Sequence, residues 1–283
     1  MAFKQYIFKF TVMTTPCEVH LYASSHDKAK QVASDILKAS KHLEIKYNFY
    51  DQNSYLSALN QRKENRLDRH TQEILKNAQY FYKTTKGIFD VTVGTLKQSM
   101  QYDTIDKIEK SKATLSAYVG CEHFSIKKNK IYFSNPHTRI DLGGFIKEYA
   151  VDNAIKIVKK SKIKTALINF GGDMYALGTK PNGDAFKIGI KNPLNPTEYI
   201  QDVYLSNQAL TTSASYERNQ TIEGKIYSHI MHTQAMQTKI LSASVLSPTV
   251  LQSGVYSTAL MIDAKLEVPF KKIVVDEKLE ILH

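Results

Sequence analysis

The sequence predicts an α+β protein with antiparallel-rich sheets and packed helices, because three patterns follow one another along the chain. Apolar residues recur at helical spacing through much of the first third, a strong amphipathic helix is expected over 145–160, and short strand-like runs dominate after residue 164. No proline- or serine-rich linker, low-complexity tract or obvious repeat interrupts this order. We therefore expect residues 1–283 to form a single domain, built as two intimately packed lobes.

The first third predicts a hairpin followed by helices. Residues 5–23 alternate between polar and apolar side chains on either side of Thr14-Thr15-Pro16, which is typical of two strands and a turn. Helical spacing from about residue 27 to residue 43 predicts the first helix. Two more helices are expected, over 54–60, where a serine can cap the first turn, and over 70–85.

The remaining two thirds predict one hairpin, one helix and many strands. Residues 119–133 indicate paired strands around Lys128-Asn129, and the helix over 145–160 presents one continuous apolar face. Strands are then expected over 165–172, 185–192, 199–207, 208–215, 227–232, 259–263 and 271–276.

Charge alone points toward a polyanionic partner, but its distribution does not. The chain carries 38 Lys and Arg against 27 Asp and Glu, a net charge of +11. The lysines are scattered, and pairs such as Lys159-Lys160 are typical of solvated helix positions. Basic and aromatic residues do not interleave as they do in RNA-recognition motifs, so we expect no nucleic-acid partner.

Cysteine usage and hydropathy favour a cytoplasmic protein without a membrane anchor. No apolar stretch reaches the length of a membrane span, and residues 1–10 alternate instead of forming the apolar centre of a signal peptide. Cys17 and Cys121 occur outside any CxxC or CxxH spacing, so we expect both thiols to be reduced and structural.

A first segment of chemical interest covers residues 140–149, where a strand end is expected before Gly143 and Gly144 at the start of a helix. Free N–H groups at a helix start, approached closely through glycine, suit an anionic phosphate. A tight strand-to-helix turn explains the same pattern. The segment has neither the GxGxxG of a dinucleotide fold nor the GK[ST] of a P-loop.

Two further segments combine turns with polar side chains. In residues 169–178, two strands flank a glycine pair, and Asn169 and Asp173 either serve function or fix the turn through their side chains. Residues 211–218 form a hydroxyl cluster that is either nucleophilic or a polar strand edge. His229 and His232 follow, and a strand would place these two imidazoles on opposite faces.

Read together and in order, these segments resemble the family of FAD:protein FMN transferases. The similarity runs through Phe10–Thr15, Ser54, Asn60, Gly87–Gly94, Asp141–Asp152, Asn169–Gly178, Thr212–Arg218, His229-Ile230 and Ser257–Leu260. Each motif is weak alone, but their number and order cover nearly the whole chain.

The resemblance implies a T-fold-like architecture with FAD in a cleft between the lobes. It also implies that Mg²⁺ lies beside the pyrophosphate while a threonine of a target flavoprotein displaces AMP and receives FMN. By motif, the residues lining the FAD site are Met13, Tyr50, Phe89, Asp90, Gly143, Tyr149 and Ile230. The metal positions are the Ile146 carbonyl, Ser257 and Thr258, and the catalytic positions are His229 and Thr258.

The chain departs from the family at four places. Gly254 stands where active members usually carry a metal-binding aspartate, and Mg²⁺ prefers such hard oxygen ligands. His232 replaces another usual aspartate, and residues 233–236 replace the proline-threonine-glycine turn that usually follows it. Residues 48–50 keep only the aromatic Tyr50. The alternative function is therefore a catalytically weakened FAD-binding protein of the same family, unless a carboxylate such as Asp263 substitutes at the metal.

Overall fold

The computed structural model describes residues 3–195, 197–214, 219–222, 225–228 and 239–282. Within these ranges an eight-stranded sheet forms the centre of the fold, and every neighbouring pair of its strands is antiparallel. In spatial order the strands are β1 (Lys4–Val12), β2 (Thr15–Ala23), β5 (Ala166–Phe170), β6 (Asp173–Leu177), β9 (Gln208–Ala214), β12 (Ile240–Ser247), β13 (Lys271–Asp276) and β14 (Ile281–Leu282).

The hairpin predicted over 5–23 is confirmed as β1 and β2. Its turn consists of Met13 and Thr14, which both have positive φ angles, 53° and 58°. Two successive residues of this kind make the tight connection whose twist matches the flanking strands. The turn therefore lies slightly before the predicted position, and Thr15 and Pro16 already belong to β2.

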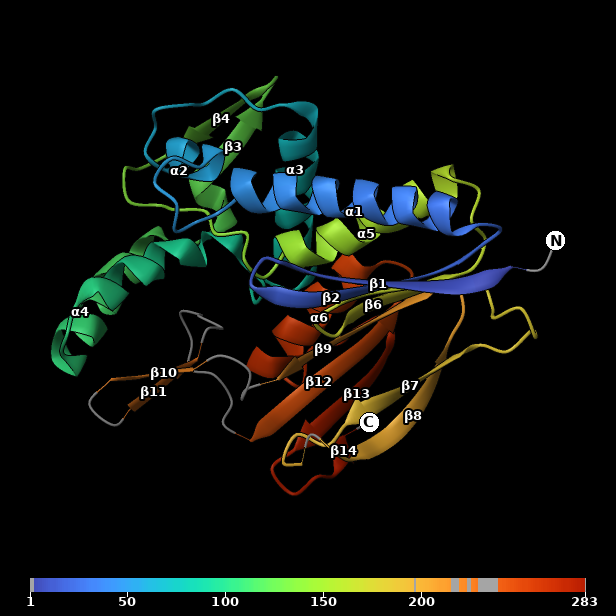
Figure 1. Ribbon diagram of the computed structural model, residues 1–283. Coiled ribbons are helices and arrows are strands. Elements are labelled where there is room, and N and C mark those ends of the chain that lie inside the picture. Colours follow the sequence, from blue (N-terminus) through green and yellow to red (C-terminus); the bar gives the residue numbers. More distant parts are fainter. Residues whose placement is uncertain (1–2, 196, 215–218, 223–224, 229–238, 283) are drawn as a thin grey trace.

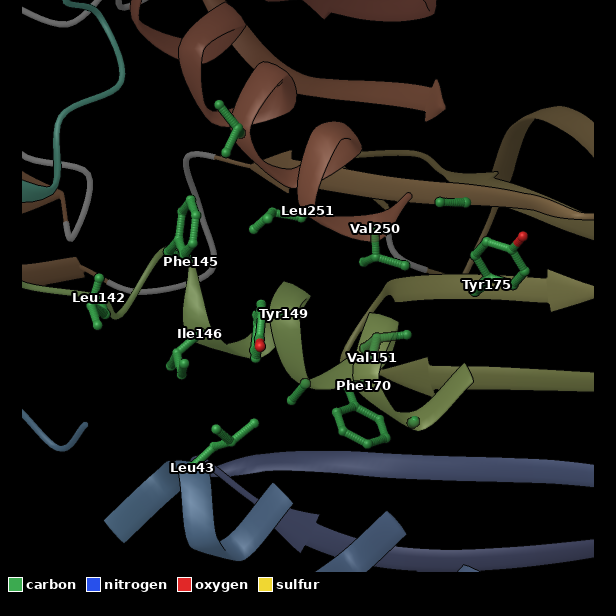
Figure 2. Close-up of a cluster of buried hydrophobic side chains, with 14 of the residues drawn as sticks. Leu43, Leu142, Phe145, Ile146, Tyr149, Val151, Phe170, Tyr175, Val250 and Leu251 are labelled. Atoms are coloured by element: carbon green, nitrogen blue, oxygen red, sulfur yellow. The ribbon is translucent and has the colours of Figure 1, made fainter. Parts of the chain in front are cut away.

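Three helices cover one face of the sheet. α1 (His26–Lys46) lies on β1 and β2, α5 (Ile146–Lys160) on β5 and β6, and α6 (Val250–Ile262) on β9 and β12 (Figure 1). Figure 2 shows α5 between α6 and α1, with apolar side chains of all three helices directed toward one another. The main hydrophobic core lies between these helices and the sheet.

A hairpin covers the opposite face. It is formed by β7 (Phe186–Lys191) and β8 (Tyr199–Leu205). Phe186, Val203 and Leu205 are buried there against apolar side chains of the main sheet, namely Ala176, Leu210, Leu246, Ile273 and Val275. The central strands are thus buried on both faces.

Smaller elements complete the described fold. They are α2 (Tyr55–Asn60), α3 (Arg69–Thr84), the 3₁₀ helices η1 (Val91–Gln101), η2 (Ser116–Tyr118) and η3 (Cys121–His123), α4 (Ile105–Leu115), and the hairpins β3 (Phe124–Lys127) with β4 (Lys130–Phe133) and β10 (Asn219–Ile222) with β11 (Lys225–Ser228). The predicted helices over 54–60 and 70–85 are confirmed, and the Ser54 Oγ accepts the Ser57 amide at 3.0 Å as the expected cap. η1 and α4 lie outside the helices that the sequence predicts.

Two local expectations were wrong, and one of two alternatives is excluded. Residues 259–263 are not a strand, because they form the last turn and the C-cap of α6. No strand leads into Gly143, since the described chain from 138 to 142 is irregular. The hydroxyl-rich strand β9 is not an edge, because β6 and β12 pair with its two sides.

The predicted α+β class with an antiparallel sheet is confirmed. Among the described helices, none is long and apolar enough to cross a membrane.

Candidate functional site

The turns of two hairpins meet at one end of the main sheet. The Gly171 amide donates to the carbonyl of Pro16 at 3.0 Å, which joins the β5–β6 turn to the start of β2. Gly171 has a φ of +60°, and a Cβ there would collide with the methyl group of Thr15. Glycine is therefore required for both its backbone conformation and this close approach. Asn169 Oδ1 accepts the Gly172 amide at 2.8 Å, so this side chain fixes the turn, one of its two predicted roles.

The N-terminal turn of α5 contacts the same end of the sheet. Lys147 Nζ lies 2.7 Å from Oδ2 of Asp173, the first residue of β6, and Asp173 is only 2% exposed. An ion pair with a buried carboxylate thus joins residues 140–149 to residues 169–178. Such a pair holds its partners firmly in position, because separating it would leave an uncompensated buried charge.

A second carboxylate from α5 lies against α6. Glu148 is 5% exposed, and its side chain covers the Cα of Gly254. A Cβ at residue 254 would collide with Cγ of Glu148 and would lie 3.1 Å from both its Cδ and its Oε1. Burial, and then the negative charge of nearby Asp173, raise the pKa of Glu148 above its usual value.

The hydroxyl cluster of the third segment faces α6. Ser213 Oγ lies 2.9 Å from Ser257 Oγ and 3.3 Å from Thr258 Oγ1, and Ser257 also donates to the carbonyl of Gly254 at 3.0 Å. Ser257 is fully buried, whereas Thr258 is half-buried. The structure therefore brings the predicted metal positions Ser257 and Thr258 within one helical turn of Gly254.

Ile146, the third predicted metal position, is the first residue of α5. Its side chain is buried, and Figure 2 shows it beside Phe145 at the start of this helix. A carbonyl in the first turn accepts the amide four residues later, so it can offer a cation only its second lone pair.

A polar chain links two of the predicted FAD positions, Tyr50 and Gly143. Lys97 Nζ donates to Tyr50 Oη at 3.1 Å and forms an ion pair with Asp141. Asp141 Oδ1 in turn accepts the Gly143 amide at 2.9 Å. Burial lowers the pKa of Lys97, but the charge of Asp141 and the hydrogen bonds to Asp141 and Tyr50 outweigh it, so this pKa lies above its usual value.

The glycine turn before α5 is held mainly by internal bonds. The Gly143 amide is taken by Asp141, and the Phe145 and Ile146 amides donate to the carbonyl of Leu142 at 2.9 and 2.8 Å. These contacts favour the tight turn among the two interpretations of this segment. Gly144 is exposed, with no atom within 4 Å of the position that a Cβ would occupy. Its side of the turn is therefore accessible to a ligand.

Three of the predicted FAD positions are buried. Asp90 caps η1, because its Oδ1 accepts both the amide and the hydroxyl of Thr92 at 2.7 Å, and burial raises its pKa. Phe89 packs on Phe145 with ring centroids 6.0 Å apart. Tyr149 lies in the core beside α1, and burial raises its pKa to about 12 (Figure 2).

The other predicted FAD positions are more accessible. Tyr50 is 78% exposed, Gly143 is exposed, and Met13 is half-buried in the β1–β2 turn, where its amide donates to Glu44 at 2.6 Å. Of the described positions, these three offer most surface to a ligand. Their role in FAD binding stays a prediction.

Several predicted residues lie outside the described part of the chain. These are His229 and Ile230, together with His232 and residues 215–218 and 233–236. Asp263 is described, and it caps the end of α6, where its Oδ1 accepts the Lys265 amide at 2.9 Å. Nine residues of helical rise, about 13 Å, separate it from Gly254, so it does not replace a side chain at that position.

A surface hollow of about 490 Å³ is present elsewhere. Ser206, Asn207, Pro248 and Phe270 are among its lining residues, which places it near the first residue of β9, whereas Ser213 lies near the last. The hollow is therefore not part of the site described above. The predicted FAD cleft stays a prediction.

Across the described ranges, no three His, Cys, Asp or Glu side chains gather closely enough to hold a metal ion. A cation at this end of the sheet would thus be bound by hydroxyl and carbonyl oxygens together with a single carboxylate. Oxygen donors of this kind suit Mg²⁺, so the residues present fit the metal that the resemblance implies.

Lys97 and Glu148 are site residues that the sequence did not predict. Glu148 and Asp152 interrupt the apolar face of the helix predicted over 145–160, because they lie three and seven residues after Phe145. Two carboxylates on the face of a helix that packs against the core could have marked Glu148 as a candidate site residue. Nothing comparable marks Lys97, whose partners come from distant parts of the chain.

The model of a protein family, the ApbE family, matches residues 13–269. The chain belongs to the ApbE family. The predicted resemblance is thereby confirmed, since the family's curated relatives carry the name FAD:protein FMN transferase.

Two of these ApbE relatives illustrate the level of similarity. The FAD:protein FMN transferase of Chlamydia pneumoniae is 28% identical over 167 residues, which is 57% of this chain and 51% of the relative. The enzyme of Vibrio cholerae is 24% identical over 213 residues, 72% of this chain and 64% of the relative. The chain thus spans about half to two thirds of the length of these curated relatives.

Solved ApbE structures share the fold. The ApbE protein of Thermotoga maritima has a TM-score of 0.88 at 23% identity, covering 99% of this chain and 97% of its own. The flavin transferase ApbE of Vibrio cholerae has a TM-score of 0.83 at 20% identity, covering 97% and 94%. These similarities establish that the chain has the ApbE architecture.

Proposed function

We propose that this chain is an FAD:protein FMN transferase that moves FMN from FAD to a threonine of a target flavoprotein. Membership of the ApbE family and the names of the curated relatives support this activity. The observation that carries the proposal is the convergence of Lys147, Glu148, Ser213, Ser257 and Thr258 at one end of the sheet. We further propose that residues 1–283 act as a single domain in the cytoplasm.

The proposed reaction is one displacement at phosphorus. The hydroxyl oxygen of the acceptor threonine forms a bond to the phosphorus on the FMN side of the pyrophosphate, and the bond from that phosphorus to the bridging oxygen breaks. AMP leaves with the bridging oxygen, and the hydroxyl proton passes to a base. We propose His229 as that base, because an imidazole titrates near neutral pH.

When bound, Mg²⁺ would neutralise the negative charge on the pyrophosphate. We propose that the Ile146 carbonyl, Ser257 and Thr258 hold it, as the family motif implies. Ser213 supports this arrangement, since its hydroxyl orients both Ser257 and Thr258 through hydrogen bonds.

We assign flavin binding to the accessible groups near α5. Tyr50 offers an exposed aromatic ring, and Lys97 beneath it holds the ring through its hydrogen bond and lies 5.1 Å from the ring centroid. Gly143 and Met13 contribute backbone surface beside them. Phe89, Asp90, Tyr149 and Ile230 complete the proposed FAD site, the buried ones acting through the shape of its walls.

The test is release of AMP. The purified protein is incubated with FAD and Mg²⁺, with and without a flavoprotein acceptor that carries a modifiable threonine, and AMP is followed by chromatography. We expect AMP to appear together with an acceptor that carries one FMN by mass spectrometry. An acceptor with valine in place of that threonine is the control and should receive none.

The second candidate, an FAD-binding protein with weakened catalysis, rests on the departures from the family motif, of which Gly254 is the one at a metal position. It predicts quenching of flavin fluorescence on binding without AMP release. That outcome would overturn the transferase proposal and retain the FAD site.

A further inference from the structure

The Glu148 carboxylate is buried without a full set of partners. It is 5% exposed, and within the described residues its Oε2 accepts no hydrogen bond. A buried carboxylate oxygen without a partner is costly, because it has lost its water and gained nothing in exchange. Such an atom calls for a proton, a water molecule or a cation beside it.

The position of this carboxylate is defined by Gly254. Because residue 254 has no side chain, Glu148 from α5 can extend across the surface of α6, with its Oε1 3.1 Å from the place where a Cβ would be. The two helices thus share one volume, which either a side chain of residue 254 or the side chain of Glu148 can fill. Here Glu148 fills it.

Hydroxyl oxygens lie close to Gly254 on the α6 side. Ser257 lies one turn after Gly254 on the same helix face, and Ser213 approaches from β9. Asp173, the other buried carboxylate close to Glu148, is neutralised by Lys147. Among the described residues, Glu148 is therefore the buried carboxylate with an unpartnered oxygen that is available to a divalent cation beside Ser257 and Thr258.

We propose that Glu148 is a metal ligand of this chain and supplies from α5 the carboxylate that active ApbE proteins usually carry at position 254 of α6. The inference rests on the proposed function, because that function implies the cation. It differs from a loss of the metal site, since the charge is moved between helices instead of being removed.

The test measures cation binding directly. Mn²⁺ replaces Mg²⁺ as a spectroscopic probe, and the loss of the free-ion electron paramagnetic resonance signal reports binding, with and without FAD. We expect the wild-type chain to bind Mn²⁺ and Glu148→Gln to weaken binding by about tenfold or more. Asp263→Asn is the matched control and should bind as the wild type does.

A double variant tests the exchange of position. Glu148→Ala together with Gly254→Asp returns a carboxylate to α6 and removes the side chain that would collide with it, so Mn²⁺ binding should recover relative to Glu148→Ala. Thermal unfolding of each variant establishes that it is folded. Unchanged Mn²⁺ binding in Glu148→Gln, or no binding by the wild type in either condition, overturns the inference.

The two proposals fail separately. AMP release that persists in Glu148→Gln with unchanged Mn²⁺ affinity refutes the ligand role and leaves the transferase proposal intact. Mn²⁺ binding that depends on Glu148 without any AMP release refutes the transferase proposal and supports the ligand role.

Discussion

Asp152 of α5 caps the N-terminus of α6 by accepting the amides of Val250 and Leu251 at 2.8 and 3.0 Å, one on each carboxylate oxygen. Asp152 lies one turn after Glu148 on the same helix face, and Val250 lies one turn before Gly254. This contact therefore sets the position of α6 along α5, and with it the contact between Glu148 and Gly254.

Removing this cap should destabilise the protein. Asp152→Ala leaves two amides at a helix N-terminus without their acceptors, and we expect the free energy of unfolding to fall by about 2 kcal/mol. Asp152→Asn keeps one acceptor oxygen and should lose about half as much. Urea denaturation measures both, and equal stability of wild type and Asp152→Ala would show that the cap contributes nothing.

A methyl group at Gly254 should also destabilise the fold. The Cβ of Gly254→Ala would collide with Glu148 in a fully packed region, and we expect a net loss of about 1–3 kcal/mol in the free energy of unfolding. Gly144→Ala is the control, because its added Cβ meets no atom within 4 Å.

The same collision predicts a rescue. In the background of Glu148→Ala, which removes the colliding Cγ, Gly254→Ala should cost less than it does in the wild type. A double-mutant cycle gives the coupling between the two positions. Additive effects would mean that the two side chains do not compete for the same volume.

Tyr50 should contribute to flavin affinity without contributing to stability. Its ring is 78% exposed, so Tyr50→Ala should change the free energy of unfolding by less than about 0.5 kcal/mol. Loss of ring contact should weaken FAD binding about five- to tenfold, measured by quenching of flavin fluorescence. Tyr50→Phe keeps the ring and should bind more tightly than Tyr50→Ala; unchanged affinity in Tyr50→Ala would remove Tyr50 from the FAD site.

Both thiols should react slowly in the folded protein. Cys17 is 1% exposed, and burial raises its pKa to about 11, so only about one thiol in a thousand is ionised at pH 8. Burial raises the pKa of Cys121 as well, with the charge of Asp90 adding to it. A thiol reagent should therefore label neither residue quickly at pH 8, but both should react at once in guanidinium; rapid labelling of the native chain would contradict this.

Local sequence patterns predicted most of the helices and strands. The alternation in residues 5–23 and the apolar stripe of residues 145–160 predicted β1, β2 and α5, because each element buries only one face and so shows its period. α6 could not be recognised in this way. It is buried on almost every side, so its apolar residues show no helical periodicity. The apolar run in its last turn fits a strand equally well.

The candidate site was predicted only in its parts. Family motifs indicated Ser257 and Thr258, and the structure brings both to Ser213. The contact between Glu148 and Gly254 joins residues more than a hundred positions apart, and a missing side chain leaves no mark in the sequence of its neighbour. Tertiary proximity of this kind had to be observed.

The hydroxyls of Ser257 and Thr258 belong to a core helix and not to a surface loop. An almost wholly apolar helix such as α6 is held in place by its packing, and its side chains have already lost their rotational freedom when the chain folds. A ligand that meets these hydroxyls consequently finds them in one arrangement and does not have to order them. The hydrophobic core makes these hydroxyls rigid. Substitutions that loosen the packing of α6 would therefore reduce the preorganisation of Ser257 and Thr258 for a ligand.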